Sequence, residues 1–319
     1  QLYADWKSLS AHLKTDNVRL LGYFNPFLVD VSEHPTAQRN LYQEALEKGY
    51  LVKDKHAKPY QIAITDFTAG LVDITNTEVF DWLKAIIKQQ VKRNGFSGWM
   101  ADFGEALPTQ AVLANNTSAL DFHNLFPQEW ARLNAEVVRE LGLQDEAVFF
   151  MRAGFNQSPS YASLFWLGDQ NTNWSHHDGL QSAVIGCLDG GISGQSVKRA
   201  DIGGYTSLRR DIPDAGAWLL PSDLTRSYES HDGKKSTQMA LYRQQNLLMR
   251  WTEMSAFTAI FRTHEGLTPD INAQVYDTPV LRQHFARHAK LYQALATYRQ
   301  QLMTEADHTG WPLVRPPLL

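Results

Sequence analysis

Acidic, basic and aromatic residues stand at the ends of several short apolar runs in this sequence. Asp102 and Glu105 close the run 96–103, and Arg152 lies at the end of the run 147–153. Residues of the same kinds end later segments: Trp166, Asp169, Asp201, Tyr205, Arg262, His264 and Glu265. Aromatic faces can cover the apolar side of a sugar ring while charged groups bind its hydroxyls. The set therefore predicts a pocket for a polar, ring-shaped ligand.

Breaking a glycosidic bond requires two carboxyl groups in different environments. One attacks or stabilises the anomeric carbon, and the other protonates the leaving oxygen. A nearby arginine would keep the first ionised, and an apolar neighbour such as Trp166 would keep the second protonated. Asp102 and Asp169 are the candidates, because both lie at strand ends beside glycine and aromatic residues. Any single acid is more often a cap or a surface residue, so the residue types alone leave other functions open.

The segments that must position these residues alternate between strand-like and helical patterns. Strands are predicted at 19–26, 96–103, 147–153, near Asp201 and at 256–263, and helices at 37–48, 76–94, 127–141, 158–166 and 281–303. This alternation indicates a parallel sheet of the α/β class, and at this length it favours a (β/α)8 barrel of the TIM type. In such a barrel, functional side chains gather where the strands end. A doubly wound sheet is the second interpretation, although no G-x-G-x-x-G opens a helix.

Composition narrows the classes of function. The formal charge is −4 and no basic face is apparent, so we expect no nucleic-acid partner. No uninterrupted apolar run approaches the roughly 18–20 residues of a membrane-spanning helix, so we expect no membrane partner. The single cysteine, Cys187, excludes an internal disulfide and favours a cytoplasmic location.

Five strings go further than the pattern of elements. The string at 98–105 (GWMADFGE) resembles the nucleophile motif of glycoside hydrolase family 31, and those at 150–154 (FMRAG) and 166–170 (WLGDQ) resemble its arginine and acid/base motifs. The strings at 201–205 (DIGGY) and 262–266 (RTHEG) are similar to its later strands, in the same order. The forms GWMADFGE, FMRAG and GDQN most resemble the sulfoquinovosidase branch, which releases the sulfonated sugar sulfoquinovose from its α-glycosides.

The resemblance implies a role for each motif residue. Asp102 would be the nucleophile that forms a covalent glycosyl-enzyme, and Asp169 the general acid and then the general base. The substrate-binding residues would be Arg152, Trp166, Tyr205, His264 and Glu105, with Tyr205 near the sulfonate. The family uses no metal and no cofactor, and the implied partner is an anionic sulfonated glycoside. A retaining mechanism would place the two carboxyl groups about 5–6 Å apart.

The resemblance also implies a domain plan. Residues 1–305 would form an incomplete catalytic barrel, about strands 3 to 8, with the first strands missing and a polar insert near 211–237 that reads as a loop or lid. Residues 306–319 would begin a C-terminal β-domain, so the chain is expected to be truncated at both ends. The residues that grip the sulfonate in this branch would lie upstream of Gln1.

Two alternative functions and one property stay open. One alternative is an α-glucosidase or α-xylosidase of the same family, with a neutral pocket. The other, from a different class, is a carbohydrate-binding barrel without turnover. The oligomeric state is not predicted.

Overall fold

The computed structural model describes residues 5–64, 67–212, 225–229 and 235–317. The chain forms two compact units, Gln1–Phe165 (unit 1) and Trp166–Leu319 (unit 2). Among the described residues, every helix is too short or too polar to cross a lipid bilayer.

A parallel sheet forms the centre of unit 1. Its first four strands run in the order β1 (Gly22–Phe24), β5 (Gly98–Ala101), β6 (Val148–Met151) and β7 (Leu164–Trp166), and β7 ends at the first residue of unit 2. Within the described residues, β1 pairs with β5 alone and is an edge strand. The strands predicted at 19–26, 96–103 and 147–153 are therefore confirmed, each shorter than its apolar run.

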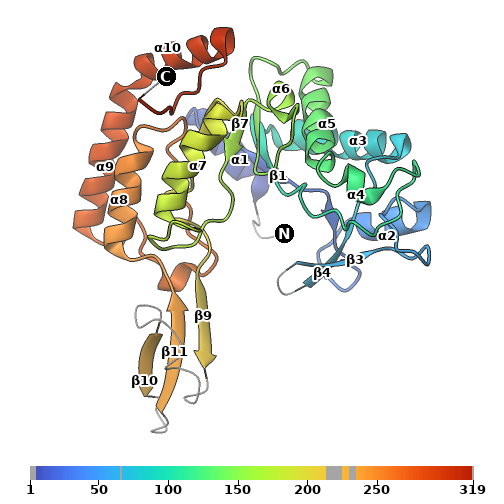
Figure 1. The fold of residues 1–319 in the computed structure, drawn as a ribbon, viewed down its shortest axis with the longest axis horizontal. Helices are drawn as coiled ribbons and strands as arrows, with labels where there is room; N and C mark the ends of the chain where they lie inside the picture. Colours follow the sequence, from blue (N-terminus) through green and yellow to red (C-terminus); the bar gives the residue numbers. More distant parts are fainter. Residues whose placement is uncertain (1–4, 65–66, 213–224, 230–234, 318–319) are drawn as a thin grey trace. The chain divides into compact units, whose positions relative to one another are not determined.

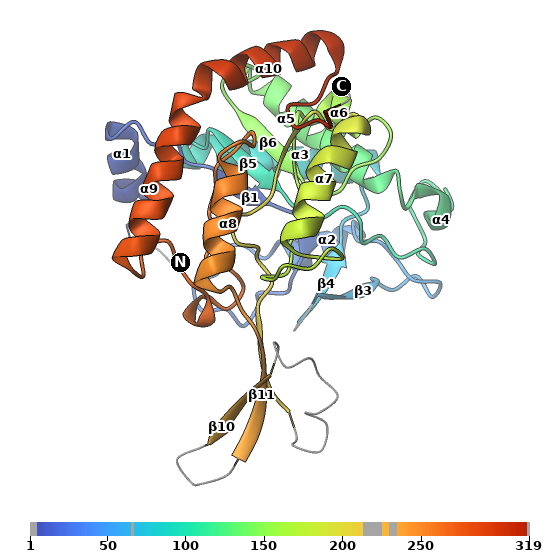
Figure 2. The same cartoon turned by 60° about the vertical axis from the view of Figure 1, so that its left-hand side comes forward.

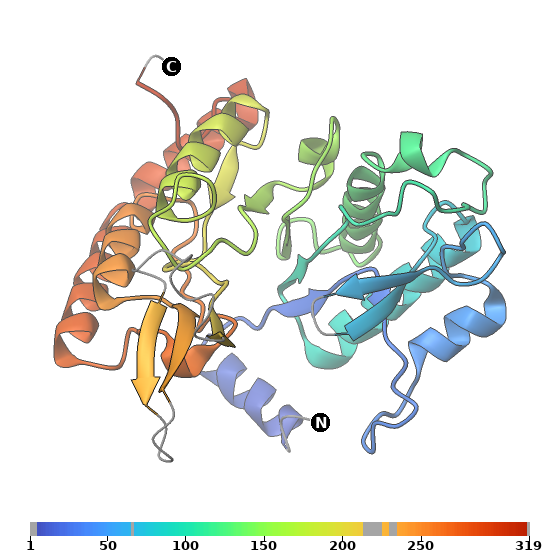
Figure 3. The ribbon, with the colours of Figure 1, turned by 60° about the horizontal axis from the view of Figure 1, so that its bottom comes forward.

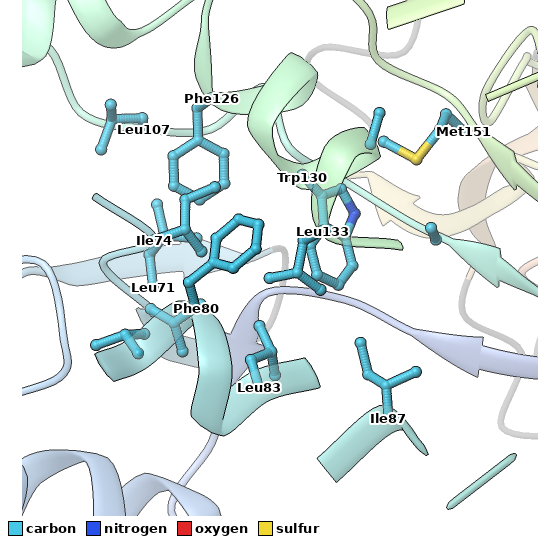
Figure 4. Packing of buried hydrophobic residues seen from close by; sticks show 14 of the residues in the cluster. Leu71, Ile74, Phe80, Leu83, Ile87, Leu107, Phe126, Trp130, Leu133 and Met151 are labelled. Carbon is cyan, nitrogen blue, oxygen red and sulfur yellow. The ribbon is translucent and has the colours of Figure 1, made fainter. Parts of the chain in front are cut away.

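Two long helices of unit 1 bury apolar faces against this sheet. In α3 (Thr77–Asn94), Asn76 caps the first turn by accepting from the Glu78 N–H at 2.9 Å, and Gly95 ends the helix at φ +67°. The other helix is α5 (Phe126–Glu140), which begins with a proline in its first turn. Figure 4 shows Phe80, Leu83 and Ile87 of α3 beside Trp130 and Leu133 of α5. Burying each such side chain contributes about 1.5–3 kcal/mol, so this packing fixes the strand ends in place.

The remaining elements of unit 1 are short. They are the helices α1 (Trp6–Thr15), α2 (Leu41–Lys48), α4 (Ala119–Phe122) and α6 (Ser158–Tyr161), and the strands β2 (Phe27–Leu28), β3 (Gln61–Ile64) and β4 (Phe67–Leu71). The three strands form an antiparallel sheet in the order β2-β4-β3, in which β3 and β4 make up the blue pair in Figure 3. The predicted helix 158–166 was wrong, because α6 stops at Tyr161 and Leu164–Trp166 is strand β7.

Helices dominate unit 2. The helices α7 (Leu180–Ile192), α8 (Gln245–Ser255) and α9 (Pro279–Ala294) lie side by side in Figures 1 and 2, followed by α10 (Ala296–Thr309). The short strand β8 covers Val197–Arg199. The carbonyl of Arg199 accepts a hydrogen bond at 3.0 Å from the N–H of Leu167, the residue that follows β7. A buried cluster that includes Leu247, Trp251 and Leu281 joins α8 to α9.

Two further predictions in unit 2 need correction. The predicted strand 256–263 is not formed, because Ala256 ends α8 and only Thr263 makes a β-bridge, to Ile202. The predicted helix 281–303 is two helices, α9 and α10, which meet at Leu295.

The insert near 211–237 contains regular structure. The strands β9 (Leu208–Ile212), β10 (Thr225–Glu229) and β11 (Lys235–Leu241) form an antiparallel sheet in the order β10-β11-β9. In Figures 1 and 2 this sheet projects away from α7 and α8. The sequence analysis read this insert as a loop or lid, and the structure adds that its described parts form strands. Residues 213–224 and 230–234 lie outside the described part of the chain.

Candidate active site

Asp102 occupies the end of the second strand of the parallel sheet. Its N–H donates to the Phe24 carbonyl at the end of β1 at 2.8 Å, and the residue is only 7% exposed. At the other end of β5, Gly98 has φ +152°, and a Cβ there would lie 2.1 Å from the Val148 carbonyl oxygen. Glycine therefore allows β5 and β6 to pair closely, which sets the position of Asp102.

Three groups contact the carboxylate of Asp102. The Tyr23 hydroxyl donates to Oδ2 at 2.5 Å, and the Phe103 N–H donates to Oδ1 at 2.8 Å. The Arg152 Nε lies 3.4 Å from Oδ1, so the arginine that the sequence analysis expected beside this acid is present. These contacts on both oxygens hold the carboxylate in one orientation and place a cation beside it.

Arg152 is itself held from two sides. Its Nε donates to Glu105 Oε1 at 3.0 Å, and its Nη2 donates to the same oxygen. The guanidinium carbon lies 4.0 Å from the centre of the Phe103 ring, a cation–π arrangement. Phe103 adopts φ +60°, which is unusual for an aromatic residue and turns its ring under Arg152. Glu105, predicted to bind substrate, contacts Arg152 in this structure.

Tyr23 was missed by the sequence analysis, which treated it as one residue of an apolar strand. The Tyr23 side chain is half-exposed, but desolvation of its hydroxyl end, the negative charge of Asp102 and the hydrogen bond to it raise the pKa of the hydroxyl well above its usual range. The hydroxyl therefore stays protonated and remains a donor at every ordinary pH. In the sequence, Tyr23 is marked only by its place near the end of a predicted strand. In the structure, Asn25 Nδ2 also donates to its hydroxyl, at 3.3 Å.

In unit 2, Trp166 is the last residue of β7, and Asp169 lies on the loop that follows. Trp166 is 2% exposed, and Gly168 turns the chain at φ +77° before Asp169. The Thr206 hydroxyl donates to the Asp169 carbonyl at 2.6 Å, and the Tyr205 N–H donates to the Gln170 carbonyl at 2.8 Å. The predicted acid/base loop is therefore tied to the segment that carries Tyr205.

His264 lies against Tyr205, with ring centroids 4.7 Å apart and planes at 80°. Its Nδ1 accepts from the Gly266 N–H at 3.0 Å, so the neutral ring carries its proton on Nε2. Burial lowers the pKa of His264, and the arginines 262, 243 and 199 act in the same direction against Asp201. His264 is therefore neutral at pH 7 and offers Nε2–H as a donor, as a hydroxyl-binding residue requires.

Asp201 serves a structural purpose in this unit. It is 3% exposed, receives a hydrogen bond from Arg262 Nη1 at 2.5 Å and pairs with the buried Arg199. The sequence analysis counted Asp201 among the residues of the predicted pocket. Its ion pairs with Arg199 and Arg262 hold Arg262 next to the end of β8.

Arg243 is a second residue that the sequence analysis missed. It is 1% exposed and donates to the carbonyls of His264 and Ala273, each at 2.8 Å. Burial lowers its pKa to about 10, so it keeps its charge at neutral pH. Gly203 has φ +91°, and a Cβ there would lie 2.2 Å from Arg243 Cδ, so glycine makes room for the arginine. Arg243 therefore fixes the backbone that carries His264.

The structure brings the predicted site residues together within each unit. Unit 1 joins Asp102, Glu105 and Arg152 in one network. In unit 2, hydrogen bonds link the Asp169 loop to the Tyr205 segment, and Tyr205 packs on His264. Asp102 and Asp169 belong to different units. The expected distance of 5–6 Å between their carboxyl groups therefore stays a prediction.

Comparisons with known proteins agree with the motif analysis. A model of the glycosyl hydrolases family 31 TIM-barrel domain matches residues 1–303, and this confirms the predicted barrel. A sulfoquinovosidase from Agrobacterium fabrum is 38% identical over 319 residues, which are 99% of this chain and 42% of the relative. One from Escherichia coli is 36% identical over 304 residues, which are 95% of this chain and 39% of the relative. The chain thus spans about two fifths of the length of these curated relatives.

A solved structure is similar over the same extent. It is a family 31 sulfoquinovosidase from E. rectale in complex with an aza-sugar inhibitor. The identity is 37%, the TM-score is 0.83, and the match covers 99% of this chain and 42% of that one.

Proposed function

We propose that this chain, which belongs to glycoside hydrolase family 31, carries both catalytic carboxylates of a retaining α-glycosidase. The observation that supports this most is the setting of Asp102. It is a buried carboxylate at a strand end, held by the Tyr23 hydroxyl and faced by Arg152 at 3.4 Å. These contacts hold the carboxylate in one orientation at the strand end, which a nucleophile requires.

The proposed reaction has two steps. In the first, an Asp102 oxygen bonds to the anomeric carbon while Asp169 donates a proton to the leaving oxygen, and the glycosidic bond breaks. In the second, Asp169 takes a proton from water, whose oxygen displaces Asp102 from the sugar. Each step inverts the anomeric centre, so the product keeps the α configuration of the substrate.

The other site residues then divide into substrate contacts and supports. His264 offers its Nε2–H to a sugar hydroxyl, and Trp166 supplies an apolar wall. Arg152 serves both Asp102 and the substrate, and Glu105 orients it. Tyr205, packed on His264, is the proposed neighbour of the sulfonate.

We further infer that the substrates are α-sulfoquinovosides. The support is the identity of 36–38% to two sulfoquinovosidases over nearly the whole chain. The same proposal includes an anionic sugar as the partner and a cytoplasmic location. It also includes the division of the chain into a barrel at 1–305 and a β-domain from 306. The helix α10 runs to Thr309 and so crosses that division by a few residues.

The first test compares hydrolysis of a chromogenic α-sulfoquinovoside with that of the matching α-glucoside. It uses the full-length polypeptide, with Asp102→Asn as the catalytic variant and Asp121→Asn, an exposed residue of α4, as the matched control. We expect release from the sulfonated substrate, abolished by Asp102→Asn and unchanged by Asp121→Asn. Preference for the glucoside would keep the mechanism and exclude the sulfonate. Release unaffected by Asp102→Asn would exclude the mechanism.

Ionic strength separates the two substrate classes independently. Binding of an anionic sugar by charged groups weakens as salt screens the charges, so KM for the sulfonated substrate should rise with salt. A KM that is flat between low and high salt would favour the neutral-sugar alternative.

A further inference from the structure

We propose that Glu253, His284 and His288 form a binding site for a zinc-class divalent cation on the helical layer of unit 2. The imidazole and carboxylate groups of these residues each offer a ligand atom, and the three atoms lie within 4.8 Å of one another. This site is separate from the sugar chemistry, for which the sequence analysis expected no metal. The proposal does not rest on the proposed glycosidase function.

The two helices that carry these residues hold a fixed register. Leu247, Leu248 and Trp251 of α8 and Leu281 of α9 belong to one buried cluster. Phe285 of α9 stacks on Phe261 with ring centroids 5.0 Å apart. Because this packing surrounds the three residues, their Cα positions are set before any metal binds.

His284 and His288 are four residues apart on α9 and therefore share one face of the helix. Their ring centroids lie 4.3 Å apart. Glu253 comes from α8, with Oε1 3.5 Å from His284 Nε2. Two imidazoles from one helix and a carboxylate from its neighbour are a ligand set suited to zinc. Zinc bonds of about 2.1 Å in tetrahedral geometry place ligand atoms roughly 3.4 Å apart, so the three ligand atoms must approach one another by at most about 1.4 Å.

The surroundings of His288 favour metal binding. Its Nδ1 lies 2.8 Å from the His284 carbonyl oxygen. Because a carbonyl can only accept, the proton of the neutral ring is on Nδ1, and Nε2 presents its lone pair. A backbone carbonyl on the far nitrogen is the common way in which a metal-binding histidine is oriented.

Glu253 and His284 have protein partners that a cation must replace or share. Arg250 Nη1 donates to both oxygens of Glu253, at 2.9 and 2.8 Å, which orients the carboxylate but competes for its charge. His284 Nε2 lies 3.1 Å from the Met249 carbonyl. Zinc at Nε2 would replace that hydrogen bond, and the ring proton would move to Nδ1. These costs predict moderate affinity, with a dissociation constant on the order of micromolar, weaker than a closed structural zinc site.

The test uses the full chain, freed of metal with a chelator and dialysed. Titration with Co²⁺ reports the visible bands of a four-coordinate ion, and calorimetry with Zn²⁺ gives stoichiometry and affinity. We expect one equivalent of Zn²⁺, and His284→Gln and His288→Gln should each weaken binding roughly tenfold or more. His308→Gln, an exposed histidine of α10, is the matched control and should leave binding unchanged.

Circular dichroism establishes that each variant is folded, and Glu253→Gln supplies a third ligand variant that leaves both histidines in place. Absence of Co²⁺ bands in the unaltered chain would overturn the proposal. Binding that falls equally in His284→Gln and His308→Gln would overturn it as well, because the cation would then be held by scattered surface histidines. Neither measurement involves a sugar, so a failure leaves the glycosidase proposal unaffected.

Discussion

Tyr23 and Arg152 contact different oxygens of Asp102, and only the arginine was foreseen from the sequence. Replacing Tyr23 with phenylalanine removes the donor to Oδ2 and leaves the ring in place. A hydrogen bond to a charged group contributes about 1.5–3 kcal/mol, so we expect kcat to fall roughly 10- to 100-fold. KM should change little, because the hydroxyl acts on the nucleophile. Steady-state kinetics on the substrate of the first test measure both constants.

Tyr42→Phe is the matched control for this experiment. The Tyr42 hydroxyl accepts from Gln61 Nε2 at 2.9 Å, so its removal should leave kcat unchanged. A Tyr23→Phe enzyme with full kcat, or with a loss confined to KM, would show that the hydroxyl does not position Asp102.

His264 makes stability depend on pH in a defined direction. Burial lowers its folded-state pKa, so below about pH 6.5 the unfolded chain binds a proton that the folded chain resists. Its contribution to stability is therefore complete above that pH and is lost as the pH falls through it. The stability advantage of the unaltered chain over His264→Gln should shrink between about pH 7.5 and 5.5. Urea unfolding at pH 7.5 and at pH 5.5 measures the difference in stability between the two chains. A difference that stays constant or grows toward low pH would contradict a buried, neutral His264 ring.

At the level of residues, what could be predicted depends on whether the signal is local. Asp102, Arg152 and Asp169 stand inside short strings whose neighbours identify them. Tyr23 contacts Asp102 from 79 residues away, and nothing near it in the sequence shows which strand will lie alongside. Arg243 bonds mainly to backbone carbonyls, which every residue carries, so no pattern of side chains identifies its partners.

At the level of elements, caps and burial decided which predictions were correct. Helix α3 was predicted almost to the residue, because Asn76 and Gly95 mark its ends and the apolar stripe between them has helical spacing. Strand β7 was taken for a helix because Leu164, Phe165 and Trp166 are all buried. A strand buried on both faces reads as a continuous apolar run, which periodicity cannot distinguish from a buried helix.

The turn at Gly203 leaves no room for a larger residue, because its φ is +91° and a Cβ there would lie 2.2 Å from Arg243 Cδ. In Gly203→Ala, the left-handed backbone costs about 1–2 kcal/mol, and the clash with Arg243 adds about 1–3 kcal/mol. We therefore expect a clear fall in the melting temperature. Gly310→Ala has a similar φ, +76°, with nothing within 4 Å of the new Cβ, so it should show the backbone cost alone. Equal losses in the two variants, measured by thermal unfolding, would mean that Arg243 does not restrain this turn.

At the level of the whole molecule, the two proposed catalytic residues lie in different compact units of the chain. Asp102 belongs to unit 1 and Asp169 to unit 2, each on the loop after a parallel strand. Strand ends of one barrel open on one face, so a family 31 barrel can draw its nucleophile and its acid from distant parts of the sequence. The proposed reaction therefore requires both units.

The stereochemistry of the product tests this joint arrangement directly. The retaining mechanism predicts about 5–6 Å between the two carboxyl groups, which leaves no room for water between Asp102 and the sugar. At that spacing the reaction is expected to pass through the covalent intermediate and to retain the α configuration. Proton NMR recorded in the first minutes should show the α anomer before mutarotation produces the β anomer. A β anomer appearing first would mean that water attacks directly, with the carboxyl groups roughly 6.5–9.5 Å apart. In that case Asp102 would act as a general base, and the nucleophile assignment would have to be abandoned.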